Sequence, residues 1–138
     1  MSEAIRDTHT LSKAGEDYLE AIYRISLAGG DSVRSVDVAE SLGVSKASVN
    51  KALSTLKEAG MVEQSRYGRV TLTEEGRIYA AAVWRSHRAL RTFLESDLGV
   101  EPQTADSEAC LMEHVLSEDT MRRLIAYLEE QGLVVPEE

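Results

Sequence analysis

The chain has 138 residues, a formal net charge of −9 at pH 7 and a single cysteine. This length supports one domain, or one domain with a small appendage, around its own hydrophobic core. One cysteine excludes an internal disulfide framework and favours a reducing cytoplasm. No apolar run reaches the ~20 residues of a membrane span, and the mixed-charge N-terminus does not resemble a signal peptide. We therefore expect a cytoplasmic protein with no membrane partner.

The charge is unevenly distributed. Residues 33–73 carry a local net charge of +2, which leaves −11 for the rest of the chain. A mildly basic segment within an acidic chain is compatible with DNA binding, although an acidic surface also simply favours solubility.

The first predicted helix follows residues 1–11, which are expected to form a loose arm. Ser12 can cap this helix, and Gly29 and Gly30 end it. Asp17 and Glu20 lie three residues apart near its start. Acidic residues there ordinarily interact favourably with the helix dipole, so these two carboxylates alone do not indicate a metal site.

Two short helices joined by a turn at Gly43 come next. The first is predicted over 36–42 with Ser35 as its cap, and the second begins near Ser45 and ends at Gly60. This is the pattern of a helix-turn-helix, with an ordinary helical hairpin as the alternative. The apolar residues of the second helix that would face inward are Val49, Leu53 and Leu56.

A predicted β-hairpin directly follows these helices. Its strands are expected over 61–64 and 69–72, joined by a turn that contains glycine. Arg66 and Arg69 would give this hairpin the character of a wing that reaches phosphates or the minor groove. The other candidate DNA contacts lie on the outward face of the second helix: Ser45, Lys46, Ala47, Ser48 and Lys51.

The remaining sequence predicts helices only. A long helix capped by Thr73 is expected to reach about Leu98, with these apolar positions: Ile78, Ala81, Ala82, Leu90, Phe93 and Leu94. His87 lies in its middle, and a lone histidine on a helix is more often structural than a metal ligand. The next helix is expected to begin at Asp106. A last helix is capped by Ser117, and the tail 134–138 is expected to be loose.

Three potential metal ligands of different chemistry fall within five residues. Cys110, Glu113 and His114 occupy positions i, i+3 and i+4, which share one face of a helix. A thiolate, a carboxylate and an imidazole together suit borderline divalent transition metals. One helix cannot complete a coordination shell, so further ligands must come from elsewhere. A small metallohydrolase is the enzymatic alternative, but no nucleophile–base–orienter set is evident, and we expect the protein not to be an enzyme.

These segments together resemble the diphtheria-toxin-repressor family of metal-dependent transcriptional regulators. The resemblance covers residues 12–132 and is strongest in EDYLEAIY (16–23) and EACLMEHVLS (108–117), with further matches at 38–42, 44–45, 48–49, 72–73, 76 and 85–88. It implies a mainly α fold: a winged helix-turn-helix DNA-binding domain, expected over 1–73, then an all-helical metal-binding and dimerisation domain over 74–138. Because the chain stops at 138, we expect the short manganese-type architecture without an SH3-like domain.

The resemblance also implies a function and a ligand set. Members are homodimers that bind a palindromic operator in double-stranded DNA when Mn²⁺ or Fe²⁺ binds, and that repress genes of metal uptake. The matching positions imply metal ligation by Asp17, Glu20, His87, Cys110, Glu113 and His114.

The sequence departs from the family pattern around these ligands. Cys110 stands where the manganese branch has glutamate, and a thiolate shifts preference away from Mn²⁺ towards Fe²⁺, Co²⁺ or Zn²⁺. Arg91 and Asp106 replace ligands of the iron-type ancillary site. One metal is expected, and a second, held by Glu20 and His87, is left open. The alternative function is a winged-helix regulator that responds to Zn²⁺ or Co²⁺, or to oxidation of Cys110.

Overall fold

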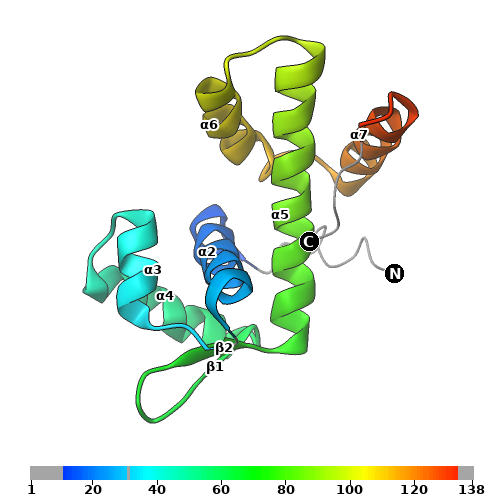
Figure 1. Cartoon of the computed structure of the whole chain (residues 1–138). Helices are drawn as coiled ribbons and strands as arrows, with labels where there is room; N and C mark the ends of the chain where they lie inside the picture. The colour runs from blue at the N-terminus through cyan, green and yellow to red at the C-terminus, as the bar shows by residue number, and fades with distance from the viewer. Residues whose placement is uncertain (1–10, 31, 134–138) are drawn as a thin grey trace. The chain divides into compact units, whose positions relative to one another are not determined.

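The computed structural model describes residues 11–30 and 32–133. The protein is mainly helical and has one two-stranded antiparallel sheet, as the sequence predicts (Figure 1). The expected loose arm, apart from Leu11, and the expected loose tail lie outside the described residues. In the described part of the chain, no helix has the length and hydropathy that would let it cross a membrane.

The chain divides into two compact units. Among the described residues, an N-terminal unit covers 11–80 and a C-terminal unit covers 81–133. This border falls inside one long helix. The domain limits of 1–73 and 74–138 stay a prediction.

The N-terminal unit contains three helices that contact one another: α2 (Lys13–Gly29), α3 (Ser35–Leu42) and α4 (Lys46–Glu58). Ser12 caps α2 as predicted, because its Oγ accepts a hydrogen bond from the amide of Gly15 at 3.1 Å. The packed core of this unit contains residues from all three helices: Leu19, Ile22, Val38, Val49, Leu53 and Leu56.

The turn between α3 and α4 confirms the helix-turn-helix prediction. Gly43 has φ 68°, a left-handed conformation that glycine adopts without strain. Ser45 caps α4 by accepting from the amide of Ser48. The predicted cap of α3 is wrong by one residue: Arg34 is the N-cap, and its guanidinium, which has no acceptor for a helix amide, donates to the Asp37 carboxylate.

The wing is a short hairpin. Strands β1 (Val62–Gln64) and β2 (Val70–Leu72) pair antiparallel, with Val62 opposite Leu72. Val33 adds an isolated bridge to Val70, with both backbone hydrogen bonds at 2.8 Å. The segment before α3 is therefore tied to the wing.

Ser65 organises the turn of the wing. Its Oγ accepts hydrogen bonds from the amides of Tyr67 and Arg69, at 3.3 and 3.2 Å. Gly68 has φ 86°, which confirms the need for glycine in this turn. The Gln64 side chain donates to the Gly68 carbonyl and braces the same turn.

The long helix α5 (Glu74–Thr92) follows the wing and approaches its backbone closely. Thr73 Oγ1 donates to the Gly60 carbonyl at 2.7 Å and accepts from the Gly76 amide at 3.0 Å, so it caps α5 as predicted. A Cβ atom on Gly76 would lie 2.0 Å from the carbonyl oxygen of Met61. Only glycine permits this approach of helix and strand.

The first turns of α5 bury a tyrosine. Tyr79 is 1% exposed, and its hydroxyl donates to the buried carboxylate of Glu16 at 2.5 Å. Ile78, which we expected to face inward, is 48% exposed. The first turns of α5 thus bury Tyr79 instead of Ile78, because the Tyr79 hydroxyl has a buried partner, whereas Leu90 and Leu94 further along are buried as predicted.

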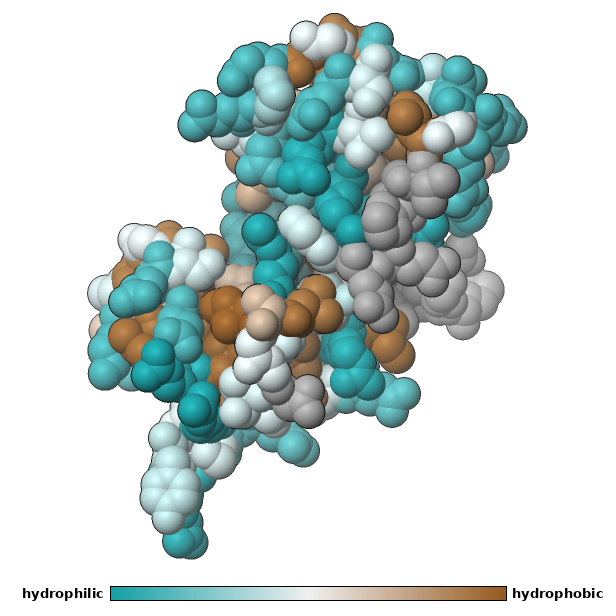
Figure 2. Space-filling view, in the orientation of Figure 1, coloured by the Kyte–Doolittle hydropathy of each residue, from teal (hydrophilic) through white to brown (hydrophobic). Residues whose placement is uncertain are grey.

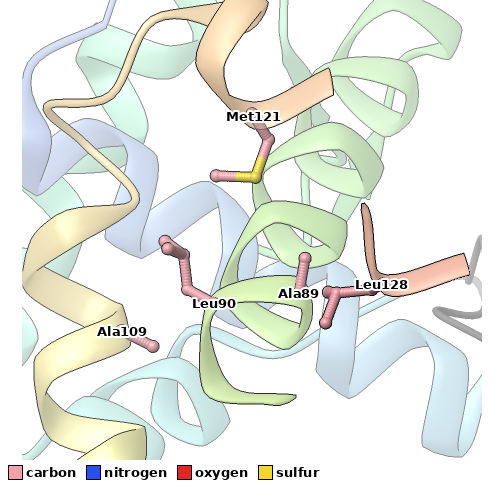
Figure 3. Packing of buried hydrophobic residues seen from close by; sticks show 5 residues of the cluster. All are labelled: Ala89, Leu90, Ala109, Met121 and Leu128. Atoms are coloured by element: carbon pink, nitrogen blue, oxygen red, sulfur yellow. The ribbon is translucent and has the colours of Figure 1, made fainter. Parts of the chain in front are cut away.

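The C-terminal unit contains the rest of α5, a π-helical turn η1 (Phe93–Asp97), α6 (Pro102–Met112) and α7 (Glu118–Glu130). Its core joins α5, α6 and α7 (Figure 3) through the buried side chains of Ala89, Leu90, Ala109, Met121 and Leu128. Ser117 caps α7 by accepting from the Thr120 amide, as predicted.

Two expectations for this unit are corrected. The long helix reaches Asp97, but its last five residues are π-helical. Helix α6 begins at Pro102, not at Asp106, because proline fixes the helical φ at the first position and Glu101 accepts from the Thr104 amide. Asp106 therefore lies within α6, where its side chain is available for other contacts.

We expect Gly76→Ala to lower the free energy of unfolding by about 2–3 kcal/mol, the upper range for overpacking, since the Met61 carbonyl belongs to a paired backbone. Chemical denaturation measures this change. Gly29→Ala is the matched control, because nothing lies within 4 Å of a Cβ at Gly29. Equal stability of the two variants would contradict the steric role of Gly76.

Candidate metal centre and nucleic-acid interface

Cys110, Glu113 and His114 meet at the end of α6. Glu113 is the C-cap of this helix, and its φ of −62° and ψ of −22° continue the right-handed turn beyond Met112. The predicted spacing therefore brings the three side chains to one side, although Glu113 and His114 lie just beyond the last residue of the helix. Sγ of Cys110 and one donor atom each of Glu113 and His114 lie within 4.8 Å of one another.

This cluster is largely removed from water. The Glu113 side chain has no exposed surface and that of His114 is 4% exposed, with His114 Nε2 3.5 Å from Glu113 Oε2. A buried carboxylate is costly unless positive charge or hydrogen bonds compensate it. The set of sulfur, oxygen and nitrogen donors fits a divalent transition metal.

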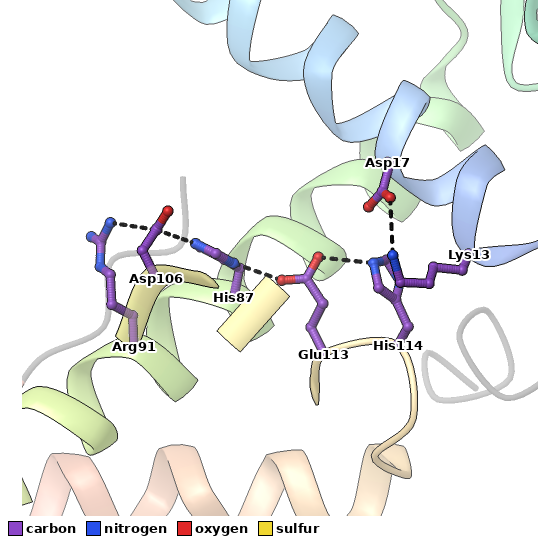
Figure 4. A network of polar contacts seen from close by, with 7 residues as sticks. All are labelled: Lys13, Asp17, His87, Arg91, Asp106, Glu113 and His114. Carbon is purple, nitrogen blue, oxygen red and sulfur yellow. Dashed lines mark hydrogen bonds and ion pairs between the residues drawn. The ribbon is translucent and has the colours of Figure 1, made fainter. Parts of the chain in front are cut away.

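His87 extends the cluster from α5. Its Nδ1 lies 2.8 Å from Glu113 Oε1, and its Nε2 lies 2.8 Å from Asp106 Oδ1 (Figure 4). His87, which the resemblance implies as a ligand, thus lies next to the late cluster of Cys110, Glu113 and His114, and is itself buried. Both of its ring nitrogens face carboxylates.

Asp106 is a member of this network that the sequence analysis misassigned as a helix cap. The hydrogen bond from His87 and the nearby charge of Arg91 lower the pKa of the Asp106 carboxyl. Arg91 Nη1 lies 3.4 Å from Asp106 Oδ1. The Glu101–Pro102 start signal could have placed Asp106 inside the helix, one turn before Cys110.

Asp17 and Glu20 lie in the N-terminal unit, on α2. Asp17 is partly exposed and lies 3.5 Å from the ammonium of Lys13. Glu20 is 7% exposed, an unusual environment for a carboxylate. Helix α2 thus carries two carboxylates about one turn apart, one partly exposed and one buried.

The outward face of α4 carries the predicted DNA contacts. Ser45, Lys46, Ala47, Ser48 and Lys51 are all exposed. The opposite face is buried through Val49, Leu53 and Leu56, as predicted. Ser45 Oγ also donates to Ser48 Oγ at 3.1 Å, so part of its bonding capacity is used within the helix.

Arg66 and Arg69 are exposed in the wing. The projecting tip of this hairpin is hydrophilic (Figure 2). Between the two arginines, Tyr67 is 85% exposed, so the wing presents two cations and one aromatic ring to solvent.

The chain matches two family descriptions in succession. Residues 10–70 match the N-terminal DNA binding domain of iron dependent repressors, and residues 73–131 match their metal binding and dimerisation domain. An HTH-type transcriptional regulator of Methanocaldococcus jannaschii is 32% identical over 87% of this chain and 96% of its own length. The iron-dependent repressor IdeR of Mycobacterium tuberculosis is 35% identical over 82% of this chain.

A manganese-dependent transcriptional repressor, solved in complex with manganese, is 36% identical and superposes with a TM-score of 0.76 over 86% of this chain and 53% of its own. The chain thus belongs to the iron-dependent repressor family of metal-dependent, DNA-binding transcriptional repressors. It spans about half the length of IdeR, 49%.

Trp84, the only tryptophan in the sequence, stacks on His87 with ring centroids 5.3 Å apart and planes 11° apart. We therefore expect His87→Ala to change the emission intensity or wavelength of Trp84 in metal-free protein. Steady-state fluorescence measures this. Asp119→Ala, an exposed substitution on α7, should leave the emission unchanged, and identical spectra for all three proteins would contradict the stacking.

Proposed function

We propose that this protein is a homodimeric repressor that binds a palindromic operator in double-stranded DNA when Mn²⁺ or Fe²⁺ is bound, and so controls genes of metal uptake and homeostasis. The observation that carries this proposal is the set of three donors Cys110, Glu113 and His114, gathered around a buried carboxylate in a chain that also has a winged helix-turn-helix. Its role is regulatory, not enzymatic, and its place is the cytoplasm.

We propose Asp17 as the ligand that joins the late cluster, with Glu20 and His87 beside it. The support is the match of these positions to the family's ligand positions, together with the short distance from His87 to Glu113. The thiol of Cys110 replaces a bridging carboxylate, which favours one metal over two.

The proposed mechanism begins with repulsion between carboxylates. Without a cation, Asp17, Glu20 and Glu113 cannot approach one another without electrostatic and desolvation cost. A divalent cation would cancel this repulsion and link α2 to the end of α6. The DNA-reading helices of a dimer would then hold a spacing that fits successive major grooves, ~34 Å for half-sites one turn apart. The cation would act by population shift, since it binds one arrangement better.

Cys110 bears on the identity of the metal. Mn²⁺ prefers carboxylate, carbonyl and water oxygens, whereas a thiolate favours Fe²⁺, and also Zn²⁺ and Co²⁺ in vitro. The family match supports Fe²⁺ or Mn²⁺ as the physiological metal, and of these two the thiolate favours Fe²⁺. A response to Zn²⁺, to Co²⁺ or to thiol oxidation is the competing reading of Cys110.

The proposed DNA interface combines α4 with the wing. Small side chains such as Ala47 and Ser48 allow the helix to lie deep in the major groove, and Ala47 can contact a thymine methyl group. Few side chains there could make bidentate contacts with bases, so DNA shape would supply part of the specificity. Lys46, Lys51 and the wing arginines would bind phosphates.

The C-terminal unit has exposed apolar side chains suited to a dimer interface. Leu98, Leu111 and Val115 are 60, 59 and 79% exposed. This region matches the family's dimerisation domain, and exposed apolar side chains are the kind of surface that the centre of a homodimer interface buries.

The central test is a double variant, Asp17→Ala with Glu113→Ala. We expect that added Mn²⁺ or Fe²⁺ no longer strengthens operator binding of this variant in a mobility-shift assay, because two proposed ligands are absent. The matched control is Asp119→Ala with Glu129→Ala, which removes two exposed carboxylates from α7. Full metal dependence in the first double variant would overturn the proposed mechanism.

A substitution at Cys110 tests metal preference. We expect Cys110→Glu to raise the affinity for Mn²⁺ relative to Zn²⁺, because an oxygen donor replaces sulfur. Calorimetric titration with each metal gives the ratio, and Cys110→Ser controls for simple loss of the thiolate. An unchanged ratio in Cys110→Glu would mean that Cys110 is not a ligand.

The wing arginines should act through the phosphate backbone. Arg66→Ala with Arg69→Ala is expected to weaken binding to operator and unrelated DNA alike, and to reduce the slope of log K against log salt by about 1.8 if both contact phosphates. Arg122→Ala with Arg123→Ala makes the same charge change on α7 and should not alter the slope. Equal slopes for both double variants would exclude the wing from the interface.

A further inference from the structure

His87 is held by three groups of the C-terminal unit. Trp84, one turn earlier on α5, stacks parallel to the imidazole and fixes the plane of the ring. Glu113 and Asp106 then face its two nitrogens, Nδ1 and Nε2, at 2.8 Å each. The ring is only 6% exposed, so its orientation is defined by protein groups.

The two carboxylates around His87 differ in environment. Glu113 is fully buried and belongs to the cluster with Cys110 and His114. Asp106 is 56% exposed and lies 3.4 Å from the guanidinium of Arg91. A metal ion at the Nε2 side of His87 would be repelled by Arg91, whereas the Nδ1 side faces Glu113, which belongs to the group with Cys110 and His114.

A histidine that binds a metal through one nitrogen carries its proton on the other. Such a ligand almost always donates this N–H to a carboxylate, a carbonyl or water, which fixes the tautomer and the ring orientation. Asp106 occupies the position of such an acceptor. Arg91 Nη1 in turn lies 3.4 Å from the same Oδ1 of Asp106 and forms an ion pair with this carboxylate.

We propose that Asp106 is a positioning residue of the metal centre: it accepts the Nε2–H of His87 and so presents Nδ1 as the ligating nitrogen on the side of Glu113. This inference rests on the proposed role of His87 as a ligand. Asp106 does not contact the metal, and it acts only through His87.

The test measures Co²⁺ affinity by calorimetry and by the d–d absorption of the bound ion. Asp106→Ala is expected to weaken binding about tenfold, at the lower end of the usual effect of an outer-shell partner, because the carboxylate is partly exposed. Asp106→Asn keeps an oxygen acceptor and should recover part of the loss. Asp119→Ala is the matched control: it removes an exposed carboxylate that also pairs with arginine but has no histidine partner in the contacts described.

A double-mutant cycle with His87→Ala shows whether Asp106 acts through the histidine. Once His87 is absent, Asp106→Ala should cause no further loss of Co²⁺ affinity. The inference would be overturned if Asp106→Ala lowered Co²⁺ affinity equally with and without His87. It would also be overturned if Asp106→Ala kept wild-type affinity while His87→Ala bound Co²⁺ weakly. Wild-type affinity in His87→Ala would instead refute the proposed ligation by His87.

Proton NMR of the Co²⁺-loaded protein provides a readout that a merely structural role would not change. The exchangeable Nε2–H of a ligated His87 should give a paramagnetically shifted signal that exchanges slowly in the wild-type protein. In Asp106→Ala this signal should broaden or disappear through exchange with water, whereas Asp119→Ala should retain it. An unchanged signal in Asp106→Ala would contradict the proposed hydrogen bond.

Discussion

Glu113 places a carboxylate where water cannot reach it, and the C-terminal unit is arranged around that charge. His87 from α5 and His114 from the turn after α6 both direct ring nitrogens towards it, and Cys110 lies at hand from the preceding helical turn. A buried carboxylate is stable when positive charge or hydrogen bonds compensate it, and His87 lies within hydrogen-bond distance of this one. The packing of α5 against α6 therefore brings oxygen, nitrogen and sulfur donors together around one buried carboxylate.

The N-terminal unit depends on a different constraint, the close contact between the start of α5 and the residues just before β1. Gly76 lets the helix backbone reach the Met61 carbonyl, and Thr73 bonds to both sides of the junction. Tyr79 adds a buried hydrogen bond to Glu16 on α2. The wing and the start of α5 thus have fixed geometry relative to the helices of the same unit.

Much of this could be predicted from the sequence, because local signals were unambiguous there. Ser12, Ser45, Thr73 and Ser117 are helix caps, and Gly43 and Gly68 have left-handed backbones, as expected. Periodicity also identified the buried face of α4. In each case the deciding interaction lies within a few residues of the chain.

The errors occurred where a contact distant in sequence decides the structure. The inward face of α5 depends on Tyr79 meeting Glu16, 63 residues away. The role of Asp106 depends on His87, which lies 19 residues earlier on another helix, so local cap chemistry does not reveal it. Cap chemistry alone could not rank Asp106 against Glu101, although the proline after Glu101 favoured the latter.

The π-helical turn η1 lies in the chain between His87 on α5 and Asp106 on α6. Five residues there form a wider turn than an α-helix, which takes up about one extra residue and changes the helical phase by roughly 100°. Leu94 is buried within this turn, and α6 packs against it. The contact between His87 and Asp106 thus depends on the length of the chain between α5 and α6. A one-residue deletion in η1 would misalign the two helices, although every polar side chain of the network would still be present in the sequence.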